Sequence, residues 1–136
     1  MPRFTRSDDL AKHLKKALDR LQSEVIVTVQ AELGSTKVSP VDTGRFRSSW
    51  FAAEGSPSSA VAPEGTDSPN TDATGLRVDS SKEYHLTNSL DYAQSVAIEG
   101  KVVSQPANWF IDFQNARIPK IQEAAARVIA QRFELS

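Results

Sequence analysis

The sequence has no cysteine and only two histidines among its 136 residues. Without cysteine, disulfides and thiolate metal sites are excluded. His13 falls on the polar face of a predicted helix and His85 in a predicted strand, so nothing in the pattern brings them together. No H-E-x-x-H, paired-carboxylate, nucleophile-elbow or Walker-type spacing is present. The sequence therefore predicts no enzyme, no cofactor and no metal ion.

The chain also lacks an excess of charge of one sign and a long apolar run. Sixteen basic residues stand against seventeen acidic ones, for a formal net charge of -1. This balance argues against a protein that mainly neutralises nucleic-acid phosphates. No apolar run approaches the roughly 20 residues of a membrane span, and residues 1–5 lack the apolar core of a signal peptide. We expect one soluble domain over residues 1–136, with no membrane or small-molecule partner.

A long amphipathic helix is predicted at the start of the chain. Apolar residues recur every three or four positions over residues 8–33, and charged residues fill the opposite face. Ser7 supplies a capping oxygen, the two aspartates after it place carboxylates in the first turn, and Gly34 ends the pattern. Such a helix is about 39 Å long at 1.5 Å per residue. Its β-branched run at 25–29 is locally ambiguous between helix and strand.

Two strands and a long polar segment are predicted in the middle of the chain. Residues 49–54 form an apolar run that ends at Gly55, and residues 82–89 alternate with a period of two. Between them, residues 55–81 are rich in Gly, Ser, Pro, Thr, Asp and Ala, which predicts a long flexible loop or arm with a short strand near 76–78. This segment is either a flexible insertion or an arm that becomes ordered on a neighbouring subunit.

Helical patterns return in the last third of the chain. A short helix is predicted over 90–99, followed by a brief strand or extended link at 101–104. The helical period from Pro106 onward is interrupted by Pro119, which predicts a kink or a second helix with the proline in its first turn. The fold class is therefore α+β: a small, mostly antiparallel sheet of three to four strands, flanked by the long N-terminal helix and a C-terminal helical segment.

The segment P-V-D-T-G-R-F-R-S-S-W, from Pro40 to Trp50, joins the first helix to the rest of the chain. Pro40 biases the preceding residue toward an extended backbone. The side chains of Asp42 and Thr43 can accept hydrogen bonds from a following turn, and Gly44 permits a tight backbone there. The pattern predicts a junction from extended chain to a short helix.

Two interpretations of this segment remain open. Phe46 and Trp50 are four residues apart and would share one face of a short helix, whereas Arg45 and Arg47 diverge from that face. In one interpretation the segment is a capped turn that pins two aromatic side chains into a core. In the other, the two arginines reach a partner.

A second segment, from Leu86 to Gly100, reads L-T-N-S-L-D-Y-A-Q-S-V-A-I-E-G. Together the two segments resemble the neck and tail-completion proteins of long-tailed bacteriophages, a family of head-tail joining and minor tail components. In that family a P-V-D-T-G-x-[hydrophobic]-R-x-S segment follows an N-terminal helix, and an N-x-x-x-Y-A-x-x-[V]-E-x-G-like segment precedes a C-terminal helix. Here the first motif runs from Pro40 to Ser48 almost intact, whereas in the second Glu99 stands next to the glycine rather than one residue earlier.

The resemblance implies a structural virion protein that forms a ring of six or twelve copies at the head-tail junction. Such a ring is assembled in the host cytoplasm, contacts other neck, connector and tail-tube proteins, and meets DNA only as it passes through the channel. The candidate inter-subunit contacts are Arg45, Arg47, Tyr92 and Glu99. The alternatives are a tail-terminator or head-completion ring protein, and a small adaptor protein that dimerises through the first helix.

Overall fold

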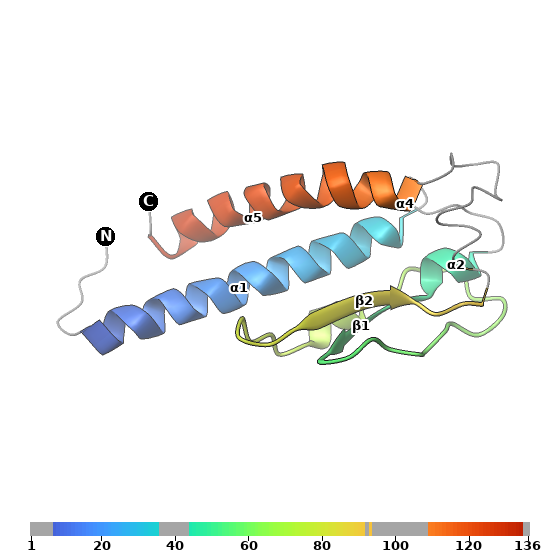
Figure 1. Ribbon diagram of the computed structural model, residues 1–136, viewed down its shortest axis with the longest axis horizontal. Coiled ribbons are helices and arrows are strands. Elements are labelled where there is room, and N and C mark those ends of the chain that lie inside the picture. Colours follow the sequence, from blue (N-terminus) through green and yellow to red (C-terminus); the bar gives the residue numbers. More distant parts are fainter. Residues whose placement is uncertain (1–6, 36–43, 92, 94–108, 135–136) are drawn as a thin grey trace.

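In the computed structural model, the described residues are 7–35, 44–91, 93 and 109–134. In chain order the elements are α1 (Ser7–Leu33), α2 (Arg45–Ser48), β1 (Trp50–Glu54), a 3-10 turn η1 (Asp72–Gly75), β2 (Tyr84–Asn88), α4 (Trp109–Asp112), a π-helical segment η2 (Phe113–Arg117) and α5 (Ile118–Arg132). Figure 1 shows α5 alongside α1, with the two strands on the other side of α1. The α+β class, with long helices at both ends and an antiparallel sheet, is confirmed.

Helix α1 begins at Ser7 and ends at Leu33, close to the predicted bounds of 8–33. Its β-branched run is helical because Val29 is buried in the core and Val25 packs against that core. Burial of an apolar face outweighs the small loss of helix propensity that branched side chains carry. The N–H of Gly34 donates to the carbonyl of Gln30 at 2.9 Å and closes the helix.

The sheet among the described residues has two strands, β1 and β2, paired antiparallel with Ala52 opposite Leu86. Both strands were predicted, but a sheet of three to four strands is not confirmed. The strand expected near 76–78 is wrong, because η1 and the irregular residues after it occupy that part of the chain. The strand or link expected at 101–104 and most of the helix expected at 90–99 lie outside the described residues.

Near η1, a side chain binds the outer edge of β1, where no other described strand pairs. The carboxylate of Asp72 accepts the outward N–H of Ala52 at 3.2 Å, in the place where another strand would bond. Beyond η1, Asp79 and Ser80 are fixed to α1 by a Lys15–Asp79 ion pair at 2.8 Å and by the N–H of Ser80, which donates to Asp19 at 2.8 Å. Residues 76–80 therefore follow the helix rather than the sheet.

The C-terminal helical segment runs from α4 through η2 into α5, and Pro119 lies in the first turn of α5. This outcome matches the second of the two arrangements predicted around the proline. A proline is tolerated there because the first N–H groups of a helix have no intrahelical acceptor.

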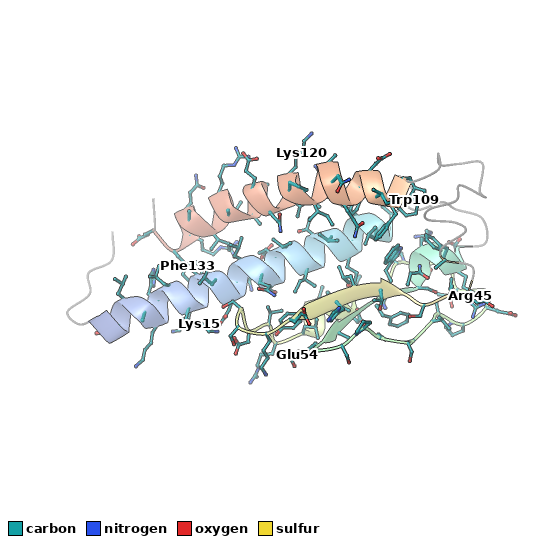
Figure 2. The ribbon with its side chains drawn as sticks, in the orientation of Figure 1. Lys15, Arg45, Glu54, Trp109, Lys120 and Phe133 are labelled. Atoms are coloured by element: carbon teal, nitrogen blue, oxygen red, sulfur yellow. The ribbon has the colours of Figure 1, made fainter. Side chains whose placement is uncertain are left out.

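The core lies where α1, α2, β1 and α4 meet. Phe46 and Trp50 are both buried with their rings 5.7 Å apart, and Phe110 stacks on Trp50 at 5.3 Å. Trp109, labelled in Figure 2, approaches the ring of Phe46 at 6.1 Å. Phe46 and Trp50 are therefore both in the core, as the first interpretation of the junction segment predicts. They do not share one face of a short helix, because α2 ends at Ser48 and Trp50 begins β1.

Candidate functional site

The sequence singled out eight residues, and the structure describes three of them. Gly44, Arg45 and Arg47 are at the start of α2. The other five lie outside the described residues: Pro40, Asp42, Thr43, Tyr92 and Glu99. Of the junction segment from Pro40 to Trp50, the structure describes residues 44–50.

Gly44 has a φ of 86°, in the left-handed region that favours glycine. A Cβ atom at this position would overlap the carboxylate of Asp67. Its carbonyl oxygen accepts hydrogen bonds from both the N–H and the hydroxyl of Ser48, at 3.1 and 2.7 Å. The tight backbone expected at Gly44 is confirmed, and it is required by the fold itself.

Arg47 makes four hydrogen bonds within its own chain. Its Nε and Nη2 donate to Asp67 Oδ1 at 3.1 and 2.8 Å, Nη2 also donates to the Asp67 carbonyl at 2.9 Å, and Nη1 donates to the Gly34 carbonyl at 3.0 Å. The Arg47 side chain is only 11% exposed. We call these contacts the Arg47 cluster, which consists of Arg47, Asp67, Gly34 and Gly44. The cluster ties the end of α1 and the start of α2 to the long polar segment.

Arg45 is bound less tightly than Arg47. Its Nε donates to the carbonyl of Ala62 at 2.8 Å, and its Nη1 lies 4.0 Å from the carboxylate of the exposed Glu64. The Arg45 side chain is 24% exposed. Figure 2 shows it at the end of the molecule opposite to Phe133. Of the two arginines, Arg45 has more donor capacity left for a partner, because it makes one hydrogen bond where Arg47 makes four.

Two serines of the same segment also bind the polar segment, and the sequence analysis missed both. The hydroxyl of Ser48 accepts the N–H of Ser68 at 3.0 Å, and the hydroxyl of Ser49 accepts the N–H of Ala62 at 3.1 Å. Both serines are buried. Consecutive serines in an otherwise aromatic segment were the available signal, because a buried hydroxyl needs a partner. Residues 62–68 are thus fastened to the junction at several points.

Gln30 is a second polar contact that the sequence analysis missed. Its amide donates to the carbonyl of Trp50 at 3.1 Å and to Asp72 at 2.5 Å, and its oxygen accepts the N–H of Ala73 at 3.0 Å. The residue is fully buried and joins α1, β1 and η1. The sequence carried a signal for it, because Gln30 is a polar residue on the apolar face of the helix, four residues after Ile26.

Lys15 links α1 to the end of the polar segment, on the surface. Lys15, labelled in Figure 2, forms ion pairs with Asp19 at 2.6 Å and Asp79 at 2.8 Å. The hydrogen bond from Lys15 lowers the pKa of the Asp79 carboxyl well below its usual range and lowers that of Asp19 as well. The same bonds raise the pKa of Lys15. The three charges hold each other ionised across the neutral range.

The N-terminal half of α1 carries an exposed apolar stripe, which consists of Leu10, Leu14 and Leu18. Their exposed fractions are 41%, 41% and 52%. The three residues are four apart and therefore lie on one face of the helix. Figure 1 shows this half of α1 extending past the strands, alongside α5. Large apolar side chains in a row are typical of a contact surface.

The stripe continues into a groove of about 550 Å³ between α1, α5 and β2. Leu18, Leu21 and Val25 of α1 form its apolar side, Gln122 comes from α5, and Tyr84 comes from β2. No charged side chain lines it among the described residues. The groove therefore suits an apolar occupant.

No family model, curated protein or solved structure matches this chain. Among the described residues, no three His, Cys, Asp or Glu side chains are grouped so that they could hold a metal ion. No described helix is long and apolar enough to cross a bilayer. A functional interpretation therefore depends on the two sequence segments and on the surfaces described above.

Proposed function

We propose that this chain is a structural virion protein of the phage neck or tail-completion class. It forms an oligomeric ring at the head-tail junction, joins the connector to the tail tube and leaves a channel for DNA. The ring has six or twelve copies and is assembled in the cytoplasm of the host bacterium. Its partners are other neck, connector and tail-tube proteins.

One observation supports the proposal: the described part of the P-V-D-T-G-R-F-R-S segment, residues 44–48, is packed into the architecture of the chain. Gly44 and Arg47, both specified by the motif, fix α1, α2 and residues 62–68 to one another through the Arg47 cluster. A motif whose glycine and arginine are both needed for the fold is expected to recur in proteins with that fold. This supports the resemblance on structural grounds.

The surface of the chain supports assembly with other subunits. The apolar stripe on α1 offers three adjacent leucines, and Arg45 offers a partly exposed guanidinium at the opposite end of the molecule. A ring built from identical head-to-tail contacts needs two different surfaces on each subunit. We propose these two surfaces for that role, with Tyr92 and Glu99 as further contacts from the resemblance. Arg47 is a weaker candidate than Arg45, because it already donates four hydrogen bonds within the chain.

The test is the mass of the purified protein over a concentration series, with and without the tail-tube protein of the same phage. The proposal expects a closed ring of six or twelve copies, either alone or on addition of the tube. Arg45→Glu is expected to leave the monomer folded and to reduce ring formation and virion yield. Arg127→Glu, at an exposed arginine on α5, is the matched control and should assemble normally. A chain that never forms a ring contradicts the proposal. An Arg45→Glu variant with normal virion yield shows that Arg45 is not an inter-subunit contact.

A specific observation also favours the adaptor alternative, because an exposed leucine stripe on a long helix suits a helix-mediated dimer. A dimer whose mass does not change when tail-tube protein is added would favour the adaptor alternative. A tail-terminator or head-completion ring differs from a neck ring only in position, so the protein that co-purifies with the ring separates these two.

A further inference from the structure

The ladder between β1 and β2 determines which backbone groups face outward. The N–H of Gly55 donates to the carbonyl of Glu83 at 2.8 Å, so these two residues face each other in the ladder. In an antiparallel pair the facing groups alternate along each strand. The N–H and C=O groups of Tyr84, Leu86 and Asn88 therefore point away from β1.

The two outer edges of the sheet differ. On β1, the outward carbonyl of Trp50 accepts the Gln30 amide, and the outward N–H of Ala52 binds Asp72. On β2, the outward backbone groups make no hydrogen bond to any other described residue. The sheet thus has one closed edge and one open edge within the part of the chain that the structure describes.

The open edge lacks the features that usually prevent edge pairing. Proteins protect such strands with lysine, proline, bulges or very short length. Strand β2 has the sequence Y-H-L-T-N, with five residues and an uninterrupted register. It contains no lysine, no proline and no bulge, and each of its residues is only half-buried. Unpaired backbone groups at regular spacing favour an extended partner strand.

The groove between α1, α5 and β2 gives such a strand space for its side chains. Tyr84 and Leu86 share the helix-facing side of the sheet with Trp50, and Tyr84 lines the groove. A strand added beside β2 would direct every second side chain toward this apolar side. An incoming strand with the alternation of β2 itself fits this requirement.

We infer that β2 pairs antiparallel with β2 of a second copy of this chain. With a two-fold axis at Leu86, that residue bonds to its counterpart, and Tyr84 bonds to Asn88 of the second copy. The outward donors and acceptors of the two identical edges then match at all three positions. The product is one four-stranded sheet in the order β1, β2, β2, β1 across two copies. This dimer goes beyond the proposed ring, because it joins two identical edges whereas a head-to-tail ring joins two different surfaces.

Hydrogen exchange of the full chain, measured by NMR over a concentration series, tests the pairing. The amide protons of Tyr84, Leu86 and Asn88 are expected to exchange freely in dilute solution and at least about tenfold more slowly once the dimer forms. The Ala52 amide, already bonded to Asp72, is the internal control and should not change with concentration. Protection of the three amides already in dilute solution, or a dimer that leaves them unprotected, overturns the inference.

A pair of variants separates strand pairing from pairing through the helix. Leu86→Pro removes the outward N–H at the two-fold axis and is expected to weaken dimerisation at least about tenfold. Leu14→Glu disrupts the apolar stripe and should leave strand pairing intact. A dimer that is weakened by Leu14→Glu and unaffected by Leu86→Pro overturns the inference. If Leu86→Pro does not fold, the exchange of the unaltered chain decides.

The tail-tube experiment answers a different question from the exchange experiment. Ring formation on the tube without slowed exchange of the β2 amides refutes the strand pairing and leaves the neck proposal intact. Slowed exchange of the β2 amides in a dimer that forms no ring on the tube supports the strand pairing and refutes the neck proposal.

Discussion

Replacing Arg47 with alanine tests whether this arginine serves the fold or a partner. The substitution removes four hydrogen bonds, two to the Asp67 carboxylate and one each to the carbonyls of Asp67 and Gly34. Arg45→Ala is the matched control, because it alters a neighbouring arginine that donates one hydrogen bond, to Ala62. Arg47→Lys keeps the charge but loses the planar fork of donors.

The expected loss in the free energy of unfolding depends on how exposed each hydrogen-bond partner of Arg47 is. Asp67 is largely exposed, so its ion pair with Arg47 contributes at most about 1 kcal/mol. The two carbonyl bonds have a charged donor in a mostly buried side chain and contribute about 1 kcal/mol each. Arg47→Ala should therefore lower the free energy of unfolding by about 2 to 3 kcal/mol, and Arg47→Lys by about 1 to 2 kcal/mol. Arg45→Ala should cost about 1 kcal/mol or less.

Urea unfolding followed by tryptophan fluorescence measures these differences, because Trp50 and Trp109 are both buried in the core beside α2. The midpoint should shift most for Arg47→Ala while the slope stays unchanged. If Arg47→Ala costs no more than Arg45→Ala, Arg47 does not hold the junction together. The arginine of the motif would then not be needed for the fold.

Three further predictions concern the fold. Gly44→Val should abolish the cooperative thermal transition, because its φ of 86° and the carboxylate beside it leave no room for a side chain, whereas Gly75→Val should retain the transition. Gln30→Leu removes the buried hydrogen bonds that Gln30 makes to the Trp50 carbonyl and the Ala73 N–H, and should lower the free energy of unfolding in urea by about 2 to 4 kcal/mol; a loss below about 1 kcal/mol would contradict the role given to the Gln30 amide. Lys15→Ala should destabilise the chain at neutral pH, and the difference from the unaltered chain should shrink as pH falls below 3.8, the ordinary pKa of an aspartyl group. The sign follows because the folded pKa of Asp79 is lowered, so its stabilisation is present above the unfolded pKa and is lost as the folded carboxylate takes up a proton. A difference that stays constant down to the acid transition would show that the ion pairs of Lys15 contribute nothing.

Several elements were predictable because their signals are local. The start, length and end of α1 follow from a helical period and from Gly34, which ends the helix. Strand β1 follows from an apolar run, and β2 follows from an alternation with a period of two. The position of Pro119 in the first turn of α5 follows from the missing N–H of proline. The demand for glycine at position 44 is also local, because it concerns the backbone of a single turn.

The long polar segment was harder to predict, because its composition suggests an arm with little structure. Residues 62–80 contact α1, α2 and β1 through side chains such as Gln30, Arg47 and Ser49. These partners are 13 to 43 residues away in the chain. Composition shows that these residues are polar, but it does not identify the hydrogen-bond partner of each one. The packing of this segment could therefore not be predicted from the sequence.

The sequence by itself thus determined the approximate bounds of α1, β1 and β2, and that a glycine must precede α2. Only the tertiary structure decided that Arg47 bonds within its own chain, that Asp72 binds the outer edge of β1, and that the outer edge of β2 pairs with no other described strand. The physical reason is the separation of the interacting residues along the chain. Helical period, capping and turn chemistry act over a few residues, whereas these pairings depend on which distant backbone groups become neighbours once the core has formed.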